Sequence, residues 1–273
     1  MELRDYQAEA VKNSIRGFRD HRRQMICVST GGGKTVIFSE IARRMVNAPD
    51  RKRRIMVIAH RDELISQAVA KIEAHTGIRP GVDQAHLKPK FTDWITVASV
   101  QTLINSHTRY PENWFDLIVI DECHHALAKT YQTPLTYFGN HARILGVTAT
   151  PHPKLGRYFE FMPFSIGLIE LINLGYLVPI TVRTFPIAME LEALRPKNGD
   201  FSKGKLSNAL EPFLAGIAAR LGSSIGTRKT LIFTPLRQTS IKLVECLQTA
   251  GITAAHVDGD SANRKEILAA HGR

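Results

Sequence analysis

Short apolar runs recur along the first part of the chain, and hydrophobic and polar positions do not alternate within them. The runs lie at residues 25–28, 55–59, 95–98, 117–120 and 144–147. Longer amphipathic stretches separate them; between Glu63 and His75, for example, the apolar residues fall at helical spacing. Continuous runs of this length indicate strands that are buried on both faces of a parallel sheet and joined by crossover helices. The pattern therefore predicts an α/β fold whose functional loops follow the carboxyl ends of the strands.

A shorter α/β pattern occupies the last part of the chain. Two predicted strands and two predicted helices lie at residues 230–233, 238–250, 252–257 and 263–271. Before them, residues 166–174 read as a short helix, and the stretch 192–205, which contains Pro, Asn and Gly, reads as a surface excursion. We expect a first domain over residues 1–164 and a second, partial α/β domain over residues 165–273.

The composition is that of a globular protein, with 44% hydrophobic and 22% charged residues. No apolar run approaches the ~20 residues that a membrane helix needs, and the charged start Met1–Asp5 lacks the apolar core of a signal peptide. The three cysteines, Cys27, Cys123 and Cys246, form no C-x-x-C pair, as expected for thiols that fill packed positions in a reducing compartment. We therefore expect a cytoplasmic protein without a membrane segment.

The formal net charge is +11 and the isoelectric point is near 9.8, which indicates an anionic partner. Basic residues cluster within Arg16–Arg23, at Arg43–Arg44 and at Arg51–Arg54. The last of these runs has no interleaved aromatic residues, so by itself we interpret it as a solvated loop before the next strand. The charge of the whole chain favours a nucleic acid as the partner.

A glycine-rich segment, Ser-Thr-Gly-Gly-Gly-Lys-Thr at Ser29–Thr35, follows the first apolar run. Its three glycines allow backbone N–H groups to approach a polyphosphate closely, since no Cβ stands in the way. Lys34 comes where a helix should begin, so its ammonium and the helix N-terminus would both face the phosphates. The P-loop pattern requires a further glycine where this chain has Val28, so the match alone does not exclude an ordinary glycine-rich turn.

An acidic pair follows the fourth apolar run, in the sequence Asp-Glu-Cys-His at Asp121–His124. Asp121 suits a magnesium ligand, and Glu122 suits a general base that orients water. A helix N-cap is the structural alternative for such a pair. Zinc is not expected at the adjacent cysteine and two histidines, because neighbouring residues rarely reach one metal together.

Three further stretches accompany these two motifs: Leu-Arg-Asp-Tyr-Gln at Leu3–Gln7, His-Arg-Asp-Glu-Leu at His60–Leu64, and Thr-Ala-Thr-Pro at Thr148–Pro151. In order and character the motifs resemble those of the DEAD/DEAH-box superfamily-two helicases. The chain looks closest to the branch that holds restriction-enzyme motor subunits and RadD-type DNA repair helicases, and the resemblance covers nearly its whole length. It implies a RecA-like P-loop NTPase fold that uses ATP and Mg²⁺ and binds nucleic acid, with DNA as the expected partner.

The resemblance also implies roles for individual residues. The nucleotide-binding residues would be Arg4, Gln7, Thr30, Gly31, Gly32, Gly33, Lys34 and Thr35, with Arg4 and Gln7 at the adenine. Thr35 and Asp121 would hold Mg²⁺, and the catalytic residues would be Lys34, Asp121 and Glu122. The residues that couple the ATP site to the rest of the motor would be His124, Thr148 and Thr150. Those at the nucleic-acid backbone would be His60, Arg61, Ser99, Gln101 and Thr102, with helix capping as an equal alternative for Ser99 and Thr102.

A complete motor of this kind also carries a Gln-x-x-Gly-Arg-x-x-Arg helix whose arginines reach the γ-phosphate, and residues 1–273 contain no such segment. We therefore interpret the chain as an N-terminal portion of an ATP-dependent DNA helicase or translocase. Little hydrolysis is expected without a partner chain that completes the second domain. A non-catalytic, nucleotide-gated nucleic-acid-binding module is the alternative. A P-loop kinase is disfavoured by the acidic pair and the Thr-Ala-Thr turn.

Overall fold

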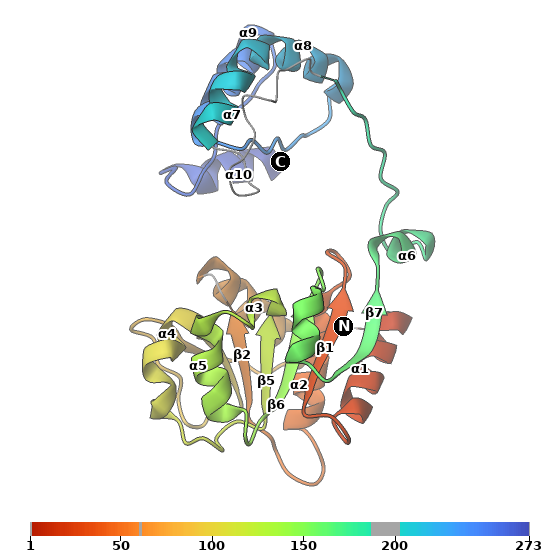
Figure 1. The fold of residues 1–273 in the computed structure, drawn as a ribbon, viewed down its shortest axis with the longest axis vertical. Helices are drawn as coiled ribbons and strands as arrows, with labels where there is room; N and C mark the ends of the chain where they lie inside the picture. Colours follow the sequence, from red (N-terminus) through yellow and green to blue (C-terminus); the bar gives the residue numbers. More distant parts are fainter. Residues whose placement is uncertain (1, 60–61, 187–202, 273) are drawn as a thin grey trace. The chain divides into compact units, whose positions relative to one another are not determined.

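The computed structural model describes residues 2–59, 62–186 and 203–272, and its contacts divide the chain into two compact units (Figure 1). The first unit comprises residues 1–180 and the second comprises residues 181–273. A seven-stranded sheet with the strand order β3-β4-β2-β5-β6-β1-β7 organises the first unit, and every neighbouring pair of strands is parallel. The predicted α/β fold is confirmed.

The strands are β1 (Arg23–Val28), β2 (Ile55–Ala59), β3 (Gly81–Asp83), β4 (Ile95–Ser99), β5 (Leu117–Asp121), β6 (Arg143–Thr148) and β7 (Phe161–Ile166). Five of them match the predicted apolar runs, and nearly all of their residues are buried. The two outermost strands, β3 and β7, have no such run in the sequence. β3 is only three residues long, and β7 contains Pro163 and stays partly exposed, as an edge strand can.

The helices of the first unit are α1 (Asp5–Gly17), α2 (Lys34–Val46), α3 (Asp62–Thr76), α4 (Val100–Ser106), α5 (Lys129–Phe138) and α6 (Leu168–Asn173). The helix predicted between Glu63 and His75 is confirmed as α3. Side chains of α1, α2 and α3 form one buried cluster with Ile55 and Val57 of β2, whereas α4 and α5 form another with Met56 and Ile58. Because successive strand residues point to opposite faces, the two clusters cover the two faces of the sheet.

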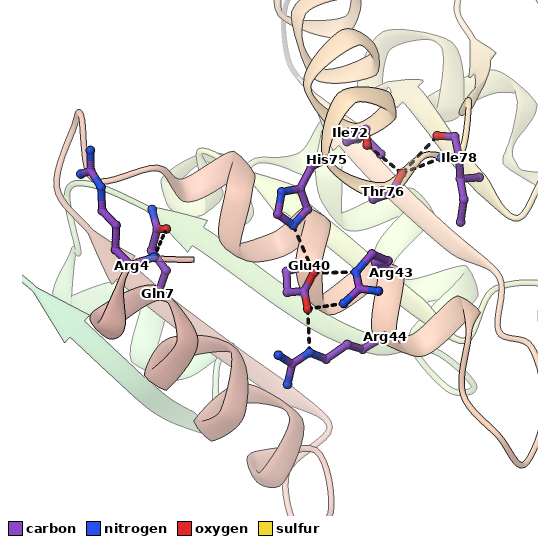
Figure 2. Close-up of polar contacts among 9 residues, drawn as sticks. All are labelled: Arg4, Gln7, Glu40, Arg43, Arg44, Ile72, His75, Thr76 and Ile78. Atoms are coloured by element: carbon purple, nitrogen blue, oxygen red, sulfur yellow. Dashed lines mark hydrogen bonds and ion pairs between the residues drawn. The ribbon is translucent and has the colours of Figure 1, made fainter. Parts of the chain in front are cut away.

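A polar cluster joins α2 to α3 (Figure 2). Glu40 of α2 is 4% exposed, and its carboxylate accepts hydrogen bonds from Arg43 at 2.7 and 2.8 Å and from Arg44 at 2.8 Å. Nε2 of His75 in α3 lies 3.1 Å from the same carboxylate. These partners, Arg43 foremost, lower the pKa of Glu40 to about 2. The carboxylate therefore stays ionised at neutral pH and holds α2 against α3.

Arg54 lies between two tryptophans at the amino end of the sheet. Its Cζ atom is 4.7 Å from the ring centroid of Trp94 and 4.2 Å from that of Trp114. Stacked guanidinium–indole contacts of this kind are favourable and fix the side chain. The interpretation of residues 51–54 as a solvated loop is therefore wrong for Arg54, because the fold brings in tryptophans from outside the run. Part of the basic charge of the chain serves the fold.

The described residues of the second unit form four α-helices, α7 (Lys203–Leu210), α8 (Leu214–Ile225), α9 (Arg237–Thr249) and α10 (Arg264–Gly272). The helices predicted at residues 238–250 and 263–271 are confirmed as α9 and α10. A small core consists of the buried side chains Leu214, Ala218, Leu243 and Leu247. None of the helices described in either unit combines the length and the apolar character that crossing a membrane requires.

The two strands predicted in this unit are wrong. Residues 230–233 and 252–257 carry no strand in the described part of the second unit. A two-stranded ladder is marginal in water, and no further strand is available there to extend it. Leu231 and Phe233 are consequently 66% and 92% exposed. Of the predicted surface excursion, residues 192–202 lie outside the described residues.

The division between the two units falls after Ile180, whereas the sequence pattern placed it between residues 164 and 165. β7 pairs with β1, so the chain beyond residue 164 still extends the first sheet. α6 follows and places Leu171 in the core of the first unit. Both elements therefore belong to the unit that carries the glycine-rich segment.

Candidate nucleotide-binding site

The loop between β1 and α2 holds the glycine-rich segment. Gly31 and Gly33 have φ angles of +84° and +78°, a conformation that residues with a side chain rarely adopt. A Cβ on Gly33 would also lie 2.5 Å from Nε2 of Gln7, so the loop and α1 approach too closely for a side chain there. α2 then begins at Lys34 with no acidic residue in its first turn. Its N-terminal N–H groups and the positive end of its dipole therefore favour an anion.

The acidic pair follows β5 and approaches the same loop. Nζ of Lys34 lies 3.8 Å from Oε1 of Glu122. The Glu122 backbone N–H donates to Oδ1 of Asp121 at 3.0 Å, and the Glu122 side chain makes no helix-capping hydrogen bond. Burial, followed by the neighbouring Glu122 charge, raises the pKa of Asp121 above its ordinary value. Neither carboxylate thus serves as the N-cap that the sequence left open.

Glu122 has a left-handed backbone conformation, with φ and ψ both at +52°. This conformation costs a residue with a side chain about 1–2 kcal/mol. Among the described residues, Ala85 is the only other non-glycine residue with a positive φ angle. Backbone strain of this kind is concentrated at functional sites. The backbone strain therefore indicates Glu122 as a candidate functional residue, independently of the chemistry of its carboxylate.

Oxygen donors suited to Mg²⁺ lie in the two segments that this site brings together. They are the Asp121 carboxylate at the end of β5 and the Thr35 hydroxyl in the first turn of α2. The raised pKa of Asp121 shows that its negative charge is incompletely compensated by the surrounding protein. A divalent cation would supply that compensation, so these residues fit Mg²⁺.

His124 and the turn after β6 were expected to couple the site to the rest of the motor. Nδ1 of His124 lies 3.4 Å from Oε2 of Glu122. The Thr150 N–H donates to the Thr148 hydroxyl at 3.1 Å, and that hydroxyl donates to the Thr150 carbonyl at 3.3 Å. The structure thus brings His124 to the acidic pair, while the turn from Thr148 to Thr150 is closed by its own hydrogen bonds.

The start of α1 is attached to the glycine-rich loop (Figure 2 shows Arg4 and Gln7). Gln7 is 5% exposed; its Oε1 accepts the Arg4 N–H at 3.1 Å, and its Nε2 donates to the Gly32 carbonyl at 3.3 Å. The Tyr6 hydroxyl donates to the same carbonyl at 2.7 Å. The amide expected at the adenine edge is therefore engaged within the protein. Tyr6 is a loop-binding residue that the sequence analysis missed, and its place in the Leu3–Gln7 motif was the available signal.

The residues expected at the nucleic-acid backbone lie at the end of β4 and in α4. The Ser99 hydroxyl donates to Oε1 of Gln101 at 2.7 Å and does not cap α4. The Thr102 hydroxyl accepts a backbone N–H from the segment after β3 at 3.0 Å. β4 runs parallel to β5, so these side chains share the carboxyl edge of the sheet with the acidic pair. The remaining two residues, His60 and Arg61, lie outside the described residues.

Residues 1–153 match the family described as "Type III restriction enzyme, res subunit". The chain belongs to this family. It is 30% identical over 239 residues to the "51.5 kDa protein" of a Lactococcus phage (isolate 7-9), and the match covers 86% of this chain and 48% of the relative. It is 32% identical over 171 residues to the "DNA 3'-5' translocase XPB2" of Sulfurisphaera tokodaii, with coverage of 62% of this chain and 35% of the relative.

The fold of this chain is similar to that of a solved fragment assigned to the HsdR subunit of a type I restriction enzyme from Vibrio vulnificus YJ016. Its TM-score is 0.67 at 22% identity, and the match covers 90% of this chain and 45% of that chain. The resemblance to superfamily-two helicases related to restriction-enzyme motor subunits is thereby confirmed. The chain spans 32%, 48% and 35% of the lengths of three curated relatives. It carries a helicase-like domain with a P-loop NTPase fold.

Proposed function

We propose that this chain is a portion of an ATP-dependent DNA helicase or translocase that binds and hydrolyses ATP–Mg²⁺ at the glycine-rich loop. One observation supports the proposal above all others. The Lys34 ammonium lies 3.8 Å from the Glu122 carboxylate at the N-terminus of α2, directly after a loop in which Gly31 and Gly33 have left-handed φ angles. A phosphate-binding cation and a water-orienting carboxylate are thus adjacent, as transfer of a phosphoryl group to water requires.

Each group in the site has a part in this reaction. The Gly32 N–H donates to the Ser29 carbonyl at 3.0 Å, so the other N–H groups of Thr30–Thr35 would bind phosphate oxygens, and Lys34 would neutralise the β- and γ-phosphates. Asp121 and the Thr35 hydroxyl would hold Mg²⁺, which supplies positive charge at the phosphates when bound. Glu122 would orient the attacking water and accept its proton. His124, 3.4 Å from Glu122, would keep that carboxylate in place.

Nucleic-acid binding forms the second part of the proposal. The chain carries a net charge of +11, and one relative is named as a DNA translocase. Gln101 and Thr102, together with His60 and Arg61, have amide, hydroxyl and basic groups that suit phosphate oxygens. Ser99 is 2% exposed and donates its hydroxyl proton to Gln101, so it would act by holding Gln101 in place. Contacts to phosphate position a strand without reading its sequence, so DNA would be bound without sequence preference.

A nucleotide-gated DNA-binding module that does not hydrolyse ATP is the second candidate. It would bind ATP without an arginine that reaches the γ-phosphate, and residues 1–273 contain no Gln-x-x-Gly-Arg-x-x-Arg segment to supply one. An arginine finger contributes about 10³ to 10⁵ in rate in comparable hydrolases. Residues 1–273 alone are therefore expected to turn over ATP slowly, and faster when a partner chain supplies that arginine.

The deciding experiment measures ATP turnover by residues 1–273 with and without DNA, with Glu122→Gln as the reference. Turnover in the wild-type protein that is absent in Glu122→Gln supports the hydrolase. Tight ATP binding with the same background turnover in both proteins supports the module that only binds. Absence of ATP binding in the wild-type protein contradicts both candidates.

A further inference from the structure

The segment that follows β7 packs against the glycine-rich loop. A Cβ placed on Gly32 would lie 3.0 Å from the Leu171 side chain, and one on Gly31 would lie 2.9 Å from that of Leu177. Between these two leucines the chain turns at Gly175, whose φ angle is +75°. Tyr176 follows the turn and is partly buried against the core of the first unit. The turn therefore places an aromatic ring beside the loop.

Tyr176 holds the start of α1 as well. Its ring centroid lies 4.9 Å from that of Tyr6 in an edge-to-face arrangement, and Tyr6 donates its hydroxyl to the Gly32 carbonyl. The guanidinium Cζ of Arg4 lies 5.0 Å from the Tyr176 ring centroid. Two aromatic rings thus fix the position of a basic side chain at the edge of the glycine-rich loop.

The contacts that hold Arg4 in place leave its positive charge without a carboxylate partner among the described residues. Its backbone N–H donates to Oε1 of Gln7 at 3.1 Å, and Nη1 donates to the Tyr6 hydroxyl at 3.4 Å. In the described part of the chain no carboxylate pairs with Arg4. The side chain is exposed, so one face of a planar, charged group remains available to a ligand. Guanidinium planes stack well on flat aromatic rings, nucleobases included.

We propose that Tyr176 is a positioning residue for the nucleobase: it holds the Arg4 guanidinium beside the loop so that Arg4 stacks on the base of a nucleotide whose phosphates occupy the loop. This inference rests on the proposed function. Stacking on Arg4 is a contact with the base that the Gln7 amide, which bonds the Arg4 N–H and the Gly32 carbonyl, does not supply. Tyr176 should therefore affect ligands that have a base and leave those without one unaffected.

The test compares Mg²⁺–ATP with Mg²⁺–tripolyphosphate, which has the phosphates and no base, in calorimetric titrations of residues 1–273. Tyr176→Leu is expected to weaken ATP binding about tenfold and to leave tripolyphosphate binding unchanged. Tyr176→Phe keeps the ring and should bind both ligands like the wild-type protein. The matched control is Tyr158→Leu, which removes a similar pair, since Arg23 Cζ lies 4.9 Å from the Tyr158 ring at the opposite end of β1. It should change neither affinity.

A double variant separates positioning from direct contact. Arg4→Ala should weaken ATP binding about as much as Tyr176→Leu does, and combining the two should add little, because both remove the same stack. Additive losses, or equal losses for ATP and tripolyphosphate, would overturn the proposal in favour of a general packing role for Tyr176. Arg4 is exposed, so Arg4→Ala tests the stack even if Tyr176→Leu fails to fold. A wild-type protein that binds neither ligand would instead refute the proposed function.

Discussion

The Lys34 ammonium and the Glu122 carboxylate lie 3.8 Å apart, although the two residues follow strands that do not pair with each other. Lys34 follows β1 and Glu122 follows β5, and β6 lies between those two strands. Their side chains are 14% and 35% exposed. An ion pair of this length and exposure adds little to stability, so it leaves the ammonium available to a phosphate.

Lys34→Ala should abolish measurable ATP binding and leave the fold intact. In the proposed site the ammonium supplies charge at the phosphates, and its 3.8 Å pairing with Glu122 is too long to contribute much to folding. Calorimetric titration and circular dichroism on the same sample check both halves of this prediction. The control is Lys129→Ala, which removes an exposed lysine at the start of α5 and should bind ATP normally. ATP binding by a folded Lys34→Ala protein would exclude the glycine-rich loop as the phosphate site.

Glu122→Gln should lower ATP turnover by about 10²-fold or more while ATP binding is retained. The amide keeps the size of the side chain and removes the carboxylate that we propose takes a proton from water. Steady-state turnover, measured with residues 1–273 or with a motor completed by a partner chain, checks the prediction. Equal rates in both proteins would show that another residue acts as the base.

A second variant at this position serves as a control for backbone strain. Glu122→Gly also removes the base, and glycine tolerates a φ angle of +52° without the cost that a side chain incurs. Denaturant unfolding should therefore show Glu122→Gly to be more stable than Glu122→Gln by about 0.5–1 kcal/mol. The opposite order would mean that the left-handed conformation carries no strain.

Glu40 should make stability fall in acid. Arg43 and Arg44, with His75, depress its pKa from an ordinary value of 4.5 to about 2. A depressed pKa stabilises the folded protein above pH ~4.5, and this contribution is lost as the pH falls toward 2. The loss amounts to at most about 3 kcal/mol. Denaturant unfolding at a series of pH values should show a shallower decline for Glu40→Gln than for the wild-type protein between pH 5 and pH 2.

Asp50→Asn is the matched control for this experiment. The Asp50 pKa is also lowered to about 2, chiefly by a hydrogen bond from Arg53, but its side chain is 59% exposed. Solvent screens such a pair, so removing it should change the acid dependence far less than Glu40→Gln does. Equal effects of the two substitutions would contradict the role given to the buried carboxylate.

DNA binding should weaken steeply with salt and should not depend on sequence. Each phosphate contact contributes about −0.9 to the slope of log affinity against log salt concentration on duplex DNA. The expectation follows from the net charge of +11 and from the phosphate contacts proposed at the carboxyl edge of the sheet. Titrations of two unrelated duplexes over a range of salt concentrations should give parallel lines. A flat line, or one preferred duplex, would count against a protein that follows the phosphate backbone.

The local pattern predicted the inner strands of the sheet and the helices α9 and α10, missed the two edge strands, and wrongly predicted strands in the second unit. β2, β4 and β5 are buried over nearly their whole length because both of their faces are covered, so the sequence shows them as mainly apolar runs. β7 stays half in solvent and contains Pro163, so it has no such run. Residues 230–233 have the run and no strand, since a strand also depends on neighbours that its own sequence does not specify.

The candidate site shows the same limit. The motifs around Lys34 and Glu122 could be identified from residue types, because their chemistry depends on the side chains themselves. The left-handed backbone of Glu122 could not, since glutamate gives no sign of it. The contacts of Tyr6 with the loop and with Tyr176 depend on how α1 packs against the rest of the unit, and packing brings together residues that are far apart in the sequence.

β1, the first strand of the chain, lies between β6 and β7, the last two strands of the sheet. During synthesis both edges of β1 therefore stay unpaired until nearly the whole unit has been translated, which exposes the nascent chain to misassociation. The glycine-rich loop also depends on β7, because the Ser29 N–H at its start donates to the carbonyl of Ile166, the last residue of β7, at 3.1 Å. A nascent chain released before β7 would thus contain Lys34, Asp121 and Glu122 but lack the hydrogen bond that fixes the start of the glycine-rich loop.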